Sequence, residues 1–312
     1  MGKKKKDTME LRFYEVPQNE YVLALLGDSW IRDYGHDESN LHFHNLMEIG
    51  YCKHGTGELI LNEESKPYEP AMVSIIPQNY PHVTISDSDS GPSFWEYLFF
   101  DPMVMIQELY PDNPVIQKKI LQMVNQKALF FHEWENPGVS VLVKMIMDEM
   151  RQKKKRFHEC VRGLMIALFA EHLRMCENDI AEDEIRKKTG VSQITPALEY
   201  VRNEYANNIR VEELAKASHM SETHFRRVFE SYMNMSPMDY INLMRVQKAC
   251  DIMKKTNDSM DVVAQKVGFT TTSTFNRNFK KYLNTSPYQW KISPENYERK
   301  LLNYNISALK GW

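Results

Sequence analysis

The feature that most constrains this chain is an internal repeat near its C-terminus. The stretch that begins at Ser221 reads SETHFRRVFESYMNMSP, and the stretch that begins at Thr271 reads TTSTFNRNFKKYLNTSP. Two phenylalanines, an arginine, a tyrosine, an asparagine and a Ser-Pro pair recur at equivalent positions. A period of this size means that one supersecondary unit occurs twice. The C-terminal part of the chain must therefore fold as a duplicated unit.

The sequence upstream of each copy predicts that the unit is a helix, a sharp turn and a second helix. Apolar residues at helical spacing occupy 211–215 and 261–264. Four residues after each of these stretches come His219 and Gly268. A turn between two close helices needs a residue that tolerates positive φ, which glycine does freely and histidine does with some strain.

The second helix of each copy has one apolar and one polar face. Ser221, and Thr270 or Thr271, are expected to cap these helices through their hydroxyls. The expected buried faces contain Phe225, Val228 and Phe229, and Phe275 and Phe279. The opposite faces carry side chains that can hydrogen-bond bases or phosphates: Thr223, Arg226 and Arg227, then Thr272, Ser273, Asn276 and Arg277.

The residues after each copy predict where one helix ends and the next begins. Asn234 and Asn284 tolerate the left-handed stop conformation. The pairs 236–237 and 286–287, Ser-Pro in each copy, supply an N-cap and a proline at the first helical position. A helix over 237–254 would be about 27 Å long. As a rigid spacer it would hold two reading helices near one DNA turn, about 34 Å, apart. The alternative is a plain helical bundle with surface arginines.

The N-terminal part has a different pattern, with short apolar runs between turn signals over residues 20–100. Such spacing predicts a barrel or sandwich of short strands. The runs are 21–26, 47–52, 58–61, 72–76 and 94–100. After Pro137 the period becomes helical, with one helix over 139–150 and a basic stretch, 151–156, that either contacts DNA or forms an exposed break.

A narrow apolar stripe follows this break on a long helix. It consists of Phe157, Cys160, Val161, Leu164, Met165, Leu168, Phe169, His172 and Leu173. Such a stripe packs either on its own barrel or on a partner chain, and we expect it to form a homodimer. Residues 178–190 are polar and without periodicity, so we expect a linker there.

The distribution of charge and the spacing of the cysteines limit the class of protein. Residues 191–312 hold 17 Lys and Arg against 12 Asp and Glu, a net +5, whereas residues 1–190 hold 22 against 30, a net −8. A basic end on an acidic body is typical of a chain that faces phosphate at one end. Four widely spaced cysteines indicate a reducing cytosol rather than disulfides or a zinc cluster. No apolar run reaches the roughly 18 residues of a membrane span, and the basic start is not a secretory signal. We therefore expect a cytoplasmic protein without membrane contact.

With these residues in place, the sequence resembles the AraC/XylS family of transcription regulators over residues 193–291. The second copy carries most of the likeness, through Val267-Gly268-Phe269, Phe275-Asn276-Arg277 and Ser286-Pro287. The resemblance implies a seven-helix domain that inserts 221–231 and 271–281 into the major groove of double-stranded DNA. It implies base contacts from the polar faces named above and phosphate contacts from Thr274 and the helix N-termini. One departure is Asn234 and Asn284, where the family usually has glycine.

The N-terminal part resembles the cupin-type sensor that is common in this family. The likeness lies in Leu41-His42-Phe43-His44, Glu48-Ile49, the Gly55–Gly57 turn and Pro81-His82. His42, His44, Glu48 and His82 have the spacing of metal-binding cupins, and three nitrogens with one carboxylate suit Fe, Mn, Ni or Zn. Asn79 replaces a usual glycine. The group either binds a metal, lines a pocket for an organic ligand, or is structural, and we expect the pocket, without a metal or other cofactor.

Aromatic residues near this group would complete a ligand pocket. Trp95 and Tyr97, with Trp30 and Tyr34, offer faces for a sugar ring, although such residues are often simply core. The resemblance implies a small-molecule effector, with a sugar as the expected class, and RNA polymerase as a partner.

The sequence thus predicts an α+β multidomain chain without catalytic residues. We expect a cupin-like sensor over 10–132, a helical dimerisation segment over 133–178, a tandem helix-turn-helix domain over 192–292, and a tail, 293–312, of no assigned role. The expected function is a ligand-responsive activator of carbohydrate-metabolism genes. The rivals are a metal-dependent cupin enzyme with an accessory DNA-binding domain, and a DNA-binding protein whose N-terminal part only dimerises.

Overall fold

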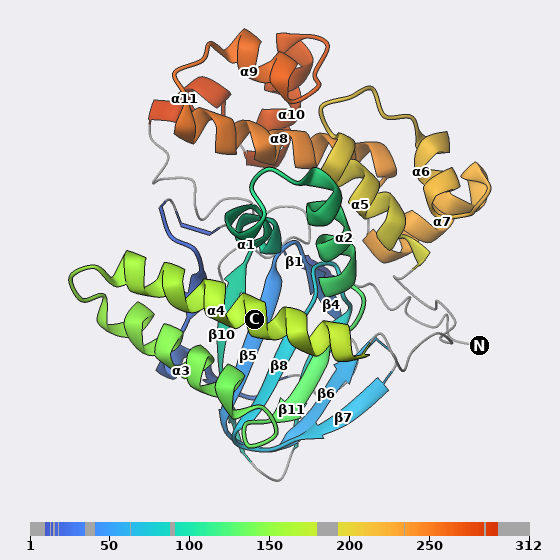
Figure 1. Cartoon of the computed structure of the whole chain (residues 1–312). Coiled ribbons are helices and arrows are strands. Elements are labelled where there is room, and N and C mark those ends of the chain that lie inside the picture. The colour runs from blue at the N-terminus through green and yellow to red at the C-terminus, as the bar shows by residue number, and fades with distance from the viewer. Residues whose placement is uncertain are drawn as a thin grey trace. The chain divides into compact units, whose positions relative to one another are not determined.

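A computed structural model describes residues 10–12, 14, 16–17, 19–34, 41–62, 64–87, 91–179, 193–233, 235–283 and 285–292. The chain divides into two compact units, one of residues 14–187 and one made chiefly of residues 188–310. The first unit combines strands and helices, and the second is helical, as predicted (Figure 1). The predicted linker from residue 180 onward and the tail 293–312 lie outside the described residues.

The first unit is built on two antiparallel sheets. One has the strand order β11-β8-β5-β10-β2, with β3 also paired to β10, and the other contains β4, β9, β6 and β7 in this order. The strands are β2 (Leu23–Leu25), β3 (Ile31–Arg32), β4 (His42–His44), β5 (Met47–His54), β6 (Gly57–Leu61), β7 (Glu64–Tyr68), β8 (Met72–Ile76), β9 (His82–Ser86), β10 (Ser93–Phe100) and β11 (Leu129–His132). A short strand, β1 (Glu10–Arg12), precedes them in the chain.

The strands β5 and β10 have two different faces because successive side chains alternate across a strand. Their register pairs Leu98 with Ile49 and Phe99 with Glu48. Ile49 and Leu98 belong to an apolar core that continues into the helices of this unit. Glu48 and Phe99 point the other way, into the space between the two sheets, which we call the barrel interior.

Four helices cover the outer face of this sheet. They are α1 (Pro102–Leu109), α2 (Pro114–Val124), α3 (Pro137–Gln152) and α4 (Phe157–Asp179). The side chain of Asp101 accepts a hydrogen bond from Met103 N, and that of Asn113 from Ile116 N, so both short helices begin with a cap and a proline. Between α3 and α4, Lys153 has φ 43° and Arg156 has φ 69°. The basic stretch is therefore an exposed break between helices, as one reading of the sequence proposed.

The apolar stripe of α4 packs on its own barrel. Val161, Met165, Leu168, Phe169 and Leu173 are all buried in the core shared with β5, β8 and β10. Figure 1 shows α3 and α4 as a hairpin against this sheet. The expectation that this stripe forms the seam of a dimer is therefore wrong, because the surface of these side chains is already covered within the chain. Cys160, which the sequence analysis placed in the same stripe of α4, is exposed.

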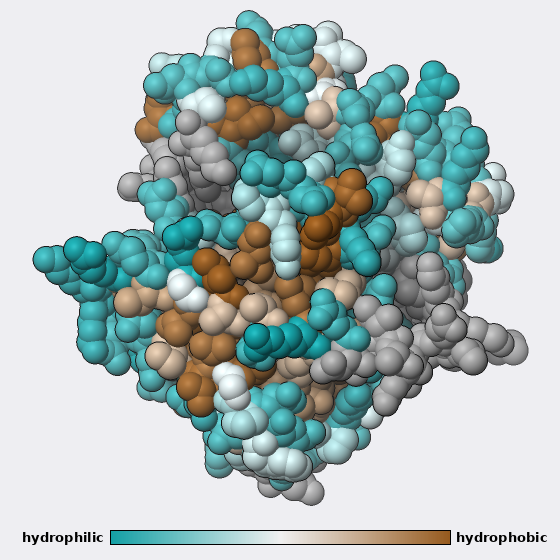
Figure 2. All heavy atoms as spheres, viewed as in Figure 1, coloured by the Kyte–Doolittle hydropathy of each residue, from teal (hydrophilic) through white to brown (hydrophobic). Residues whose placement is uncertain are grey.

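A different set of apolar side chains is exposed on the helical layer of the first unit. Val141 and Met145, one turn apart on α3, are 51% and 48% exposed. Figure 2 shows apolar residues gathered over α3 and α4 on the face turned to the viewer. A partner chain would have to use a surface of this kind.

The second unit consists of seven described helices. They are α5 (Thr195–Glu204), α6 (Val211–Ala217), α7 (Glu222–Met233), α8 (Pro237–Lys255), α9 (Met260–Lys266), α10 (Thr272–Leu283) and α11 (Pro287–Ile292). Within the described ranges, no helix has the length and apolar character needed to cross a membrane.

Candidate nucleic-acid interface and barrel interior

The first helix-turn-helix is formed by α6 and α7. His219 has φ 55°, the left-handed conformation that the sequence predicted for this position. His219 N donates to Lys216 O at 3.0 Å and Met220 N donates to Ala215 O at 2.9 Å, so the end of α6 is closed by backbone hydrogen bonds. The chain then reverses into α7 within a few residues.

The second helix-turn-helix, α9 and α10, repeats this geometry. Gly268 has φ 90° and donates from its N to Gln265 O at 3.0 Å, and Phe269 N donates to Ala264 O at 2.9 Å. Glycine is needed here for a further reason. A Cβ on Gly268 would lie 2.7 Å from Ala206 O and 2.8 Å from Tyr205 O. The two copies therefore share one turn but not the same freedom to carry a side chain.

Three of the predicted helix caps are present. Thr271 Oγ1 accepts from Thr274 N at 3.1 Å, Ser236 Oγ from Asp239 N at 3.1 Å and Ser286 Oγ from Gln289 N at 3.2 Å. At Ser221 it is the carbonyl that is bonded, to Phe225 N, and its hydroxyl cap remains a prediction. The predicted stop residues Asn234 and Asn284 lie outside the described residues.

Each reading helix buries its phenylalanines and exposes its polar face. Phe225, Phe229, Phe275 and Phe279 are fully buried, whereas Val228 is only half-buried. The exposed set contains Thr223, Arg226, Arg227, Ser273, Asn276 and Arg277, with Thr272 and Thr274 half-buried. The polar stripes thus face outward in both copies, as a DNA-reading surface requires.

The polar side chains differ in how firmly they are already held. Arg226 donates to Glu222 Oε1 from Nε at 2.8 Å and from Nη2 at 2.6 Å, and Arg227 Nη2 lies 3.2 Å from His224 Nδ1. The hydroxyl of Thr272 donates to Asp261. Within the described part of the chain, no ion pair holds Arg277. Arg277 is therefore the arginine most readily available to a base or phosphate.

Both reading helices are anchored at the start of α8. Tyr240 packs on Phe229 of α7, with ring centroids 5.8 Å apart. The adjacent Asp239 pairs with Lys281 of α10, and its carbonyl accepts from Tyr282 Oη at 2.9 Å. Contacts from both reading helices thus converge on the first turn of α8. That α8 holds the reading helices about one DNA turn apart stays a prediction.

Arg245 of α8 joins the two helix-turn-helix copies. Its Nε donates to Tyr205 O and its Nη2 to Asn207 O, both at 2.7 Å, and the guanidinium lies 5.6 Å from the centre of the Phe269 ring. The turn after α5 in the first copy and the turn of the second copy therefore share one buried cation. No role for Arg245 was predicted from the sequence. An arginine among the apolar positions of a helix was the available signal.

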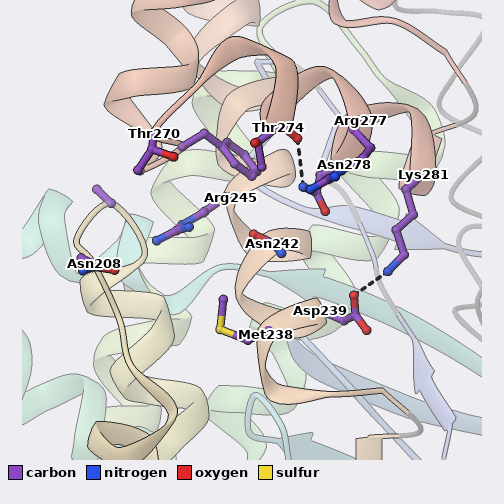
Figure 3. A pocket seen from close by; sticks show the side chains of 13 residues that line it. Asn208, Met238, Asp239, Asn242, Arg245, Thr270, Thr274, Arg277, Asn278 and Lys281 are labelled. Carbon is purple, nitrogen blue, oxygen red and sulfur yellow. Dashed lines mark hydrogen bonds and ion pairs between the residues drawn. The ribbon is translucent and has the colours of Figure 1, made fainter.

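A groove of about 690 Å³ lies between α8 and α10 (Figure 3). One wall is formed by Thr274, Arg277 and Lys281 of α10, and the other by side chains of α8 that include Asn242 and Arg245. Since Lys281 pairs with Asp239 and Arg245 is bound to carbonyls, Arg277 supplies the available positive charge of this groove.

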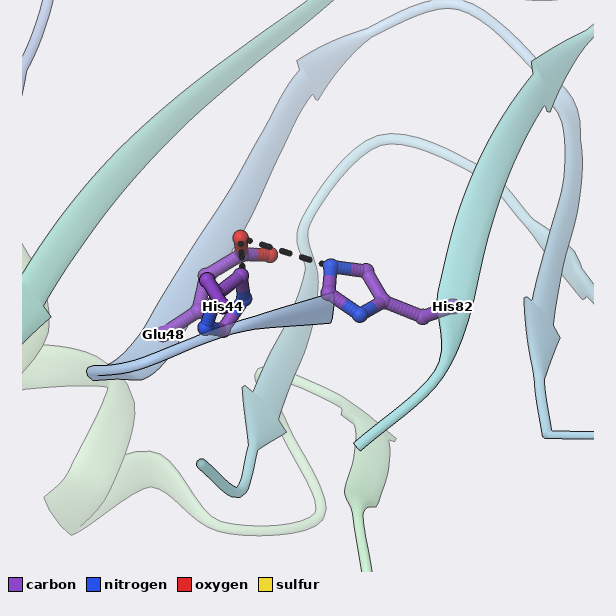
Figure 4. Close-up of side chains that lie close together, drawn as sticks. All are labelled: His44, Glu48 and His82. Atoms are coloured by element: carbon purple, nitrogen blue, oxygen red, sulfur yellow. Dashed lines mark ion pairs between the residues drawn. The ribbon is translucent and has the colours of Figure 1, made fainter. Parts of the chain in front are cut away.

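In the first unit, the predicted cupin-type residues meet in the barrel interior. His44 Nε2 lies 3.2 Å and His82 Nε2 3.5 Å from Glu48 Oε2, and all three side chains are at most 2% exposed (Figure 4). The His42 ring is 4.2 Å from that of His82, centroid to centroid. Burial would raise the pKa of Glu48, but the neighbouring imidazoles outweigh it and hold the pKa near 2, so the carboxylate is ionised. Burial lowers the pKa of His44.

The predicted aromatic residues line the same interior. Trp95 and Tyr97 of β10 are buried and stacked, with ring centroids 6.2 Å apart, and Tyr68 packs edge-on against Trp95. Tyr34 Oη donates to Trp30 O at 2.8 Å, and burial raises the pKa of the Tyr34 hydroxyl. The structure therefore brings all six predicted ligand-site residues into one interior.

Comparison with known proteins agrees with the helix-turn-helix geometry. Residues 214–292 match the family model described as a helix-turn-helix domain. An uncharacterized HTH-type transcriptional regulator of Haemophilus influenzae is 24% identical over 261 residues, which cover 80% of this chain and 86% of that protein. The raffinose operon transcriptional regulatory protein RafR of Pediococcus pentosaceus is 21% identical over 248 residues, covering 78% and 84%.

The chain carries a helix-turn-helix domain over residues 214–292 and is similar along most of its length to proteins named HTH-type transcriptional regulators. The matched region begins within α6 and ends with α11, so it includes both turns and both reading helices. Among solved structures, unsaturated fatty acid-bound ToxT of Vibrio cholerae aligns over 87% of this chain and 94% of its own, at 16% identity. The TM-score of 0.39 is too low to indicate more than a partial likeness.

Proposed function

We propose that this regulator reads a specific DNA sequence by placing α7 and α10 in successive major grooves on one side of the duplex. The observation that carries the proposal is the outward polar stripe that recurs on both helices over a buried phenylalanine face. Side chains of these types hydrogen-bond base edges in the major groove. Thr223, Arg226 and Arg227 contact bases in one half of the site, and Thr272, Ser273, Asn276 and Arg277 in the other. Thr274 contacts phosphate.

The proposed contacts differ in the cost of forming them. Arg277 has no ion pair to break within the described residues, whereas Arg226 must give up its ion pair with Glu222. An exposed pair of this kind is worth only about 0.3–0.5 kcal/mol, so it can be exchanged for a phosphate or a base. We therefore expect Arg277 to contribute most of the base discrimination and Arg226 to contribute less.

The test begins with selection of a binding site from random DNA by the full chain, followed by affinity measurements at fixed salt. Arg277→Ala should weaken binding by about 1–3 kcal/mol at the selected site and relax preference at one base pair. Arg277→Lys keeps the charge but loses the two-pronged donor, so it should lose discrimination. Lys216→Ala, an exposed cation on α6, is the matched control. Equal loss on every sequence would mean that Arg277 contacts only phosphate and would contradict the assigned role.

We further propose that the first unit is a sensor whose interior recognises a small molecule of the sugar class. The support is the set of aromatic faces, Trp95 and Tyr97 among them, beside polar side chains, together with similarity to a regulator named for a raffinose operon. The proposal keeps the division into a sensor over 10–132, a helical segment over 133–178 and a DNA-binding domain over 192–292. As an activator, the protein would recruit RNA polymerase as a homodimer, through an exposed face such as that of Val141 and Met145.

An effector can change DNA occupancy only if it binds two arrangements of the protein unequally. A panel of sugars in a thermal unfolding assay tests for binding. A specific ligand at 100 times its dissociation constant adds about 2.7 kcal/mol of stability. A panel in which no sugar raises the midpoint, together with unchanged DNA affinity, would remove the sugar class from the proposal and leave the DNA-reading function in place.

A further inference from the structure

We propose that Arg245 is a positioning residue that fixes the spacing, in base pairs, between the two half-sites that α7 and α10 read. This role rests on the proposed DNA reading and adds a determinant of specificity that lies outside both reading helices. It is supported by the contacts that one buried side chain makes with both helix-turn-helix copies.

Arg245 is connected to both reading helices through packed elements. On the side of the first copy, its guanidinium holds the carbonyls of Tyr205 and Asn207, in the turn between α5 and α6. Helix α6 then packs on α7. On the side of the second copy, the guanidinium lies over the ring of Phe269. That ring packs on Phe275 of α10, with centroids 5.5 Å apart.

The backbones of the two copies also meet beside this side chain. Gly268 approaches the carbonyls of Tyr205 and Ala206 so closely that a Cβ would collide with both oxygens. Arg245 holds the carbonyls on either side of Ala206, and Phe269 directly follows Gly268. A contact between two backbone segments cannot be relieved by a change of rotamer. A shift of one copy at this junction must therefore move the other.

Two points of attachment along α8 fix an orientation, whereas one point leaves a pivot. The first point is the start of α8, where Asp239 pairs with Lys281 of α10. At the same turn, Tyr240 packs on α7. Arg245 comes six residues after Asp239 on this helix, which is a distance of about 9 Å at 1.5 Å per residue. Loss of Arg245 leaves the second copy able to turn about the contact at Asp239.

The charge of Arg245 is costly where it lies. The side chain is 8% exposed, and among the described residues its hydrogen-bond partners are carbonyls rather than a carboxylate. Burial lowers the pKa of the guanidinium. An apolar side chain would cover the same face of α8 without removing a cation from water. The role best attested for such a group is to fix register, as a polar residue among the apolar positions of a coiled coil does.

A rigid pair of reading helices discriminates between spacings of its half-sites. B-form DNA turns once in about 10–10.5 base pairs, over about 34–36 Å. One added base pair therefore shifts a half-site by about 3.4 Å and rotates it by about 35° around the duplex axis. A pair held by Arg245 cannot follow both changes and keep all its base contacts. The loss of one such contact costs about fivefold or more in affinity.

The experiment measures the affinity of the full chain, at fixed salt, for the site selected from random DNA. The same site is then tested with one base pair inserted or deleted between the half-sites. The wild type should lose about fivefold or more at each altered spacing. Arg245→Met keeps an apolar chain over Phe269 but loses both hydrogen bonds, so this penalty should fall to about twofold or less. Base substitutions within either half-site should cost this variant what they cost the wild type.

Two further variants separate positioning from a merely structural role. Arg245→Lys can still bond one of the two carbonyls and should show an intermediate penalty. Lys248→Met, at a partly exposed lysine one turn farther along α8, is the matched control and should keep the wild-type penalty. A variant that only loses stability binds every site less well by the same factor, because its folded fraction enters each affinity alike. The ratio between spacings does not respond to such a loss.

Three results would overturn the proposal. The first is a wild type that accepts an added base pair without loss, and the second is a folded Arg245→Met that keeps the wild-type penalty. The third is an equal loss at all spacings with a weaker salt dependence, which would make Arg245 a phosphate contact. If Arg245→Met does not fold, Arg245→Lys supplies the comparison, and the wild-type measurement needs no variant.

A failure of the DNA reading itself has a different signature. A wild type that selects no site from random DNA would contradict the proposed function, and the role of Arg245 with it. Each of the three results above leaves the selected site and its base preferences in place.

Discussion

Replacing Gly268 by alanine probes whether the two copies of the helix-turn-helix really share one turn under different constraints. Gly268 adopts φ 90°, and the equivalent His219 adopts φ 55° with a full side chain. The difference lies in the surroundings, since His219 is exposed whereas Gly268 lies against the backbone of residues 205 and 206. Alanine at 268 therefore faces two penalties, and alanine at 219 faces only the one that histidine already bears.

The size of the effect follows from these two penalties. A left-handed conformation costs a residue with a Cβ about 1–2 kcal/mol relative to glycine. The new Cβ would lie 2.7 Å from Ala206 O and 2.8 Å from Tyr205 O, closer than real Cβ atoms approach. Backbone atoms cannot rotate away, and overpacking of this kind costs about 1–3 kcal/mol. We expect Gly268→Ala to destabilise the second unit by about 2–5 kcal/mol.

Urea and thermal unfolding of the full chain, followed by circular dichroism and fluorescence, measure this loss. For a unit of about 100 residues, 2 kcal/mol corresponds to a fall in midpoint of about 8 °C or more. The unfolding free energy of His219→Ala should stay within about 0.5 kcal/mol of the wild-type value. That of His219→Gly should equal the wild-type value or lie slightly above it. A loss below about 1 kcal/mol for Gly268→Ala, or an equal loss for His219→Ala, would refute the reasoning.

Three further predictions concern side chains that stabilise one unit from within, Glu96 and Leu168 in the first unit and Arg245 in the second. Glu96→Gln should lose about 3 kcal/mol of unfolding free energy. Burial raises the pKa of Glu96, but the hydrogen bond from Gly27 N, the hydrogen bonds and charge of Arg151 and the charge of Lys53 outweigh it and hold this pKa below its usual 4.5. Because the folded pKa is depressed, this difference should be complete above about pH 4.5 and shrink as the pH falls through the folded value. Glu108→Gln, which removes the half-buried partner of the exposed Arg162, should lose under 1 kcal/mol in the same urea titrations. Leu168→Ala should cost about 2–5 kcal/mol of unfolding free energy without changing the association state in sedimentation, and a shift in association without a loss of stability would restore the stripe as a dimer seam. Arg245→Lys should cost about 1–3 kcal/mol, because an ammonium cannot reach both carbonyls, and a change under 0.5 kcal/mol in unfolding would contradict that role.

The repeat made the second unit predictable in detail because local signals and tertiary packing agree there. The turn at His219, the caps at Ser236 and Ser286 and the buried phenylalanines all follow from short-range patterns. The anchoring of both reading helices on Asp239 and Tyr240 does not, because neighbours in the sequence gave no sign that their side chains diverge to different helices.

The first unit was predictable as a barrel but not strand by strand. Short strands such as β4 and β11 have three or four residues, too few for alternation to be distinctive. Two helices within 102–124 were not predicted, although Asp101-Pro102 and Asn113-Pro114 carried the signals of capped helix starts. The sequence did not decide which surface covers the apolar stripe of α4, because an apolar helix face has the same pattern whether it packs on its own sheet or on a partner chain.

On β5, which pairs with β10, a residue that faces the barrel interior is directly followed by one that packs against the helices. Glu48 faces the buried histidines, while Ile49, the next residue, is packed beneath the helices. We therefore expect that a ligand which shifts the backbone at Glu48 also disturbs the packing of Ile49 in the core that it shares with α3 and α4.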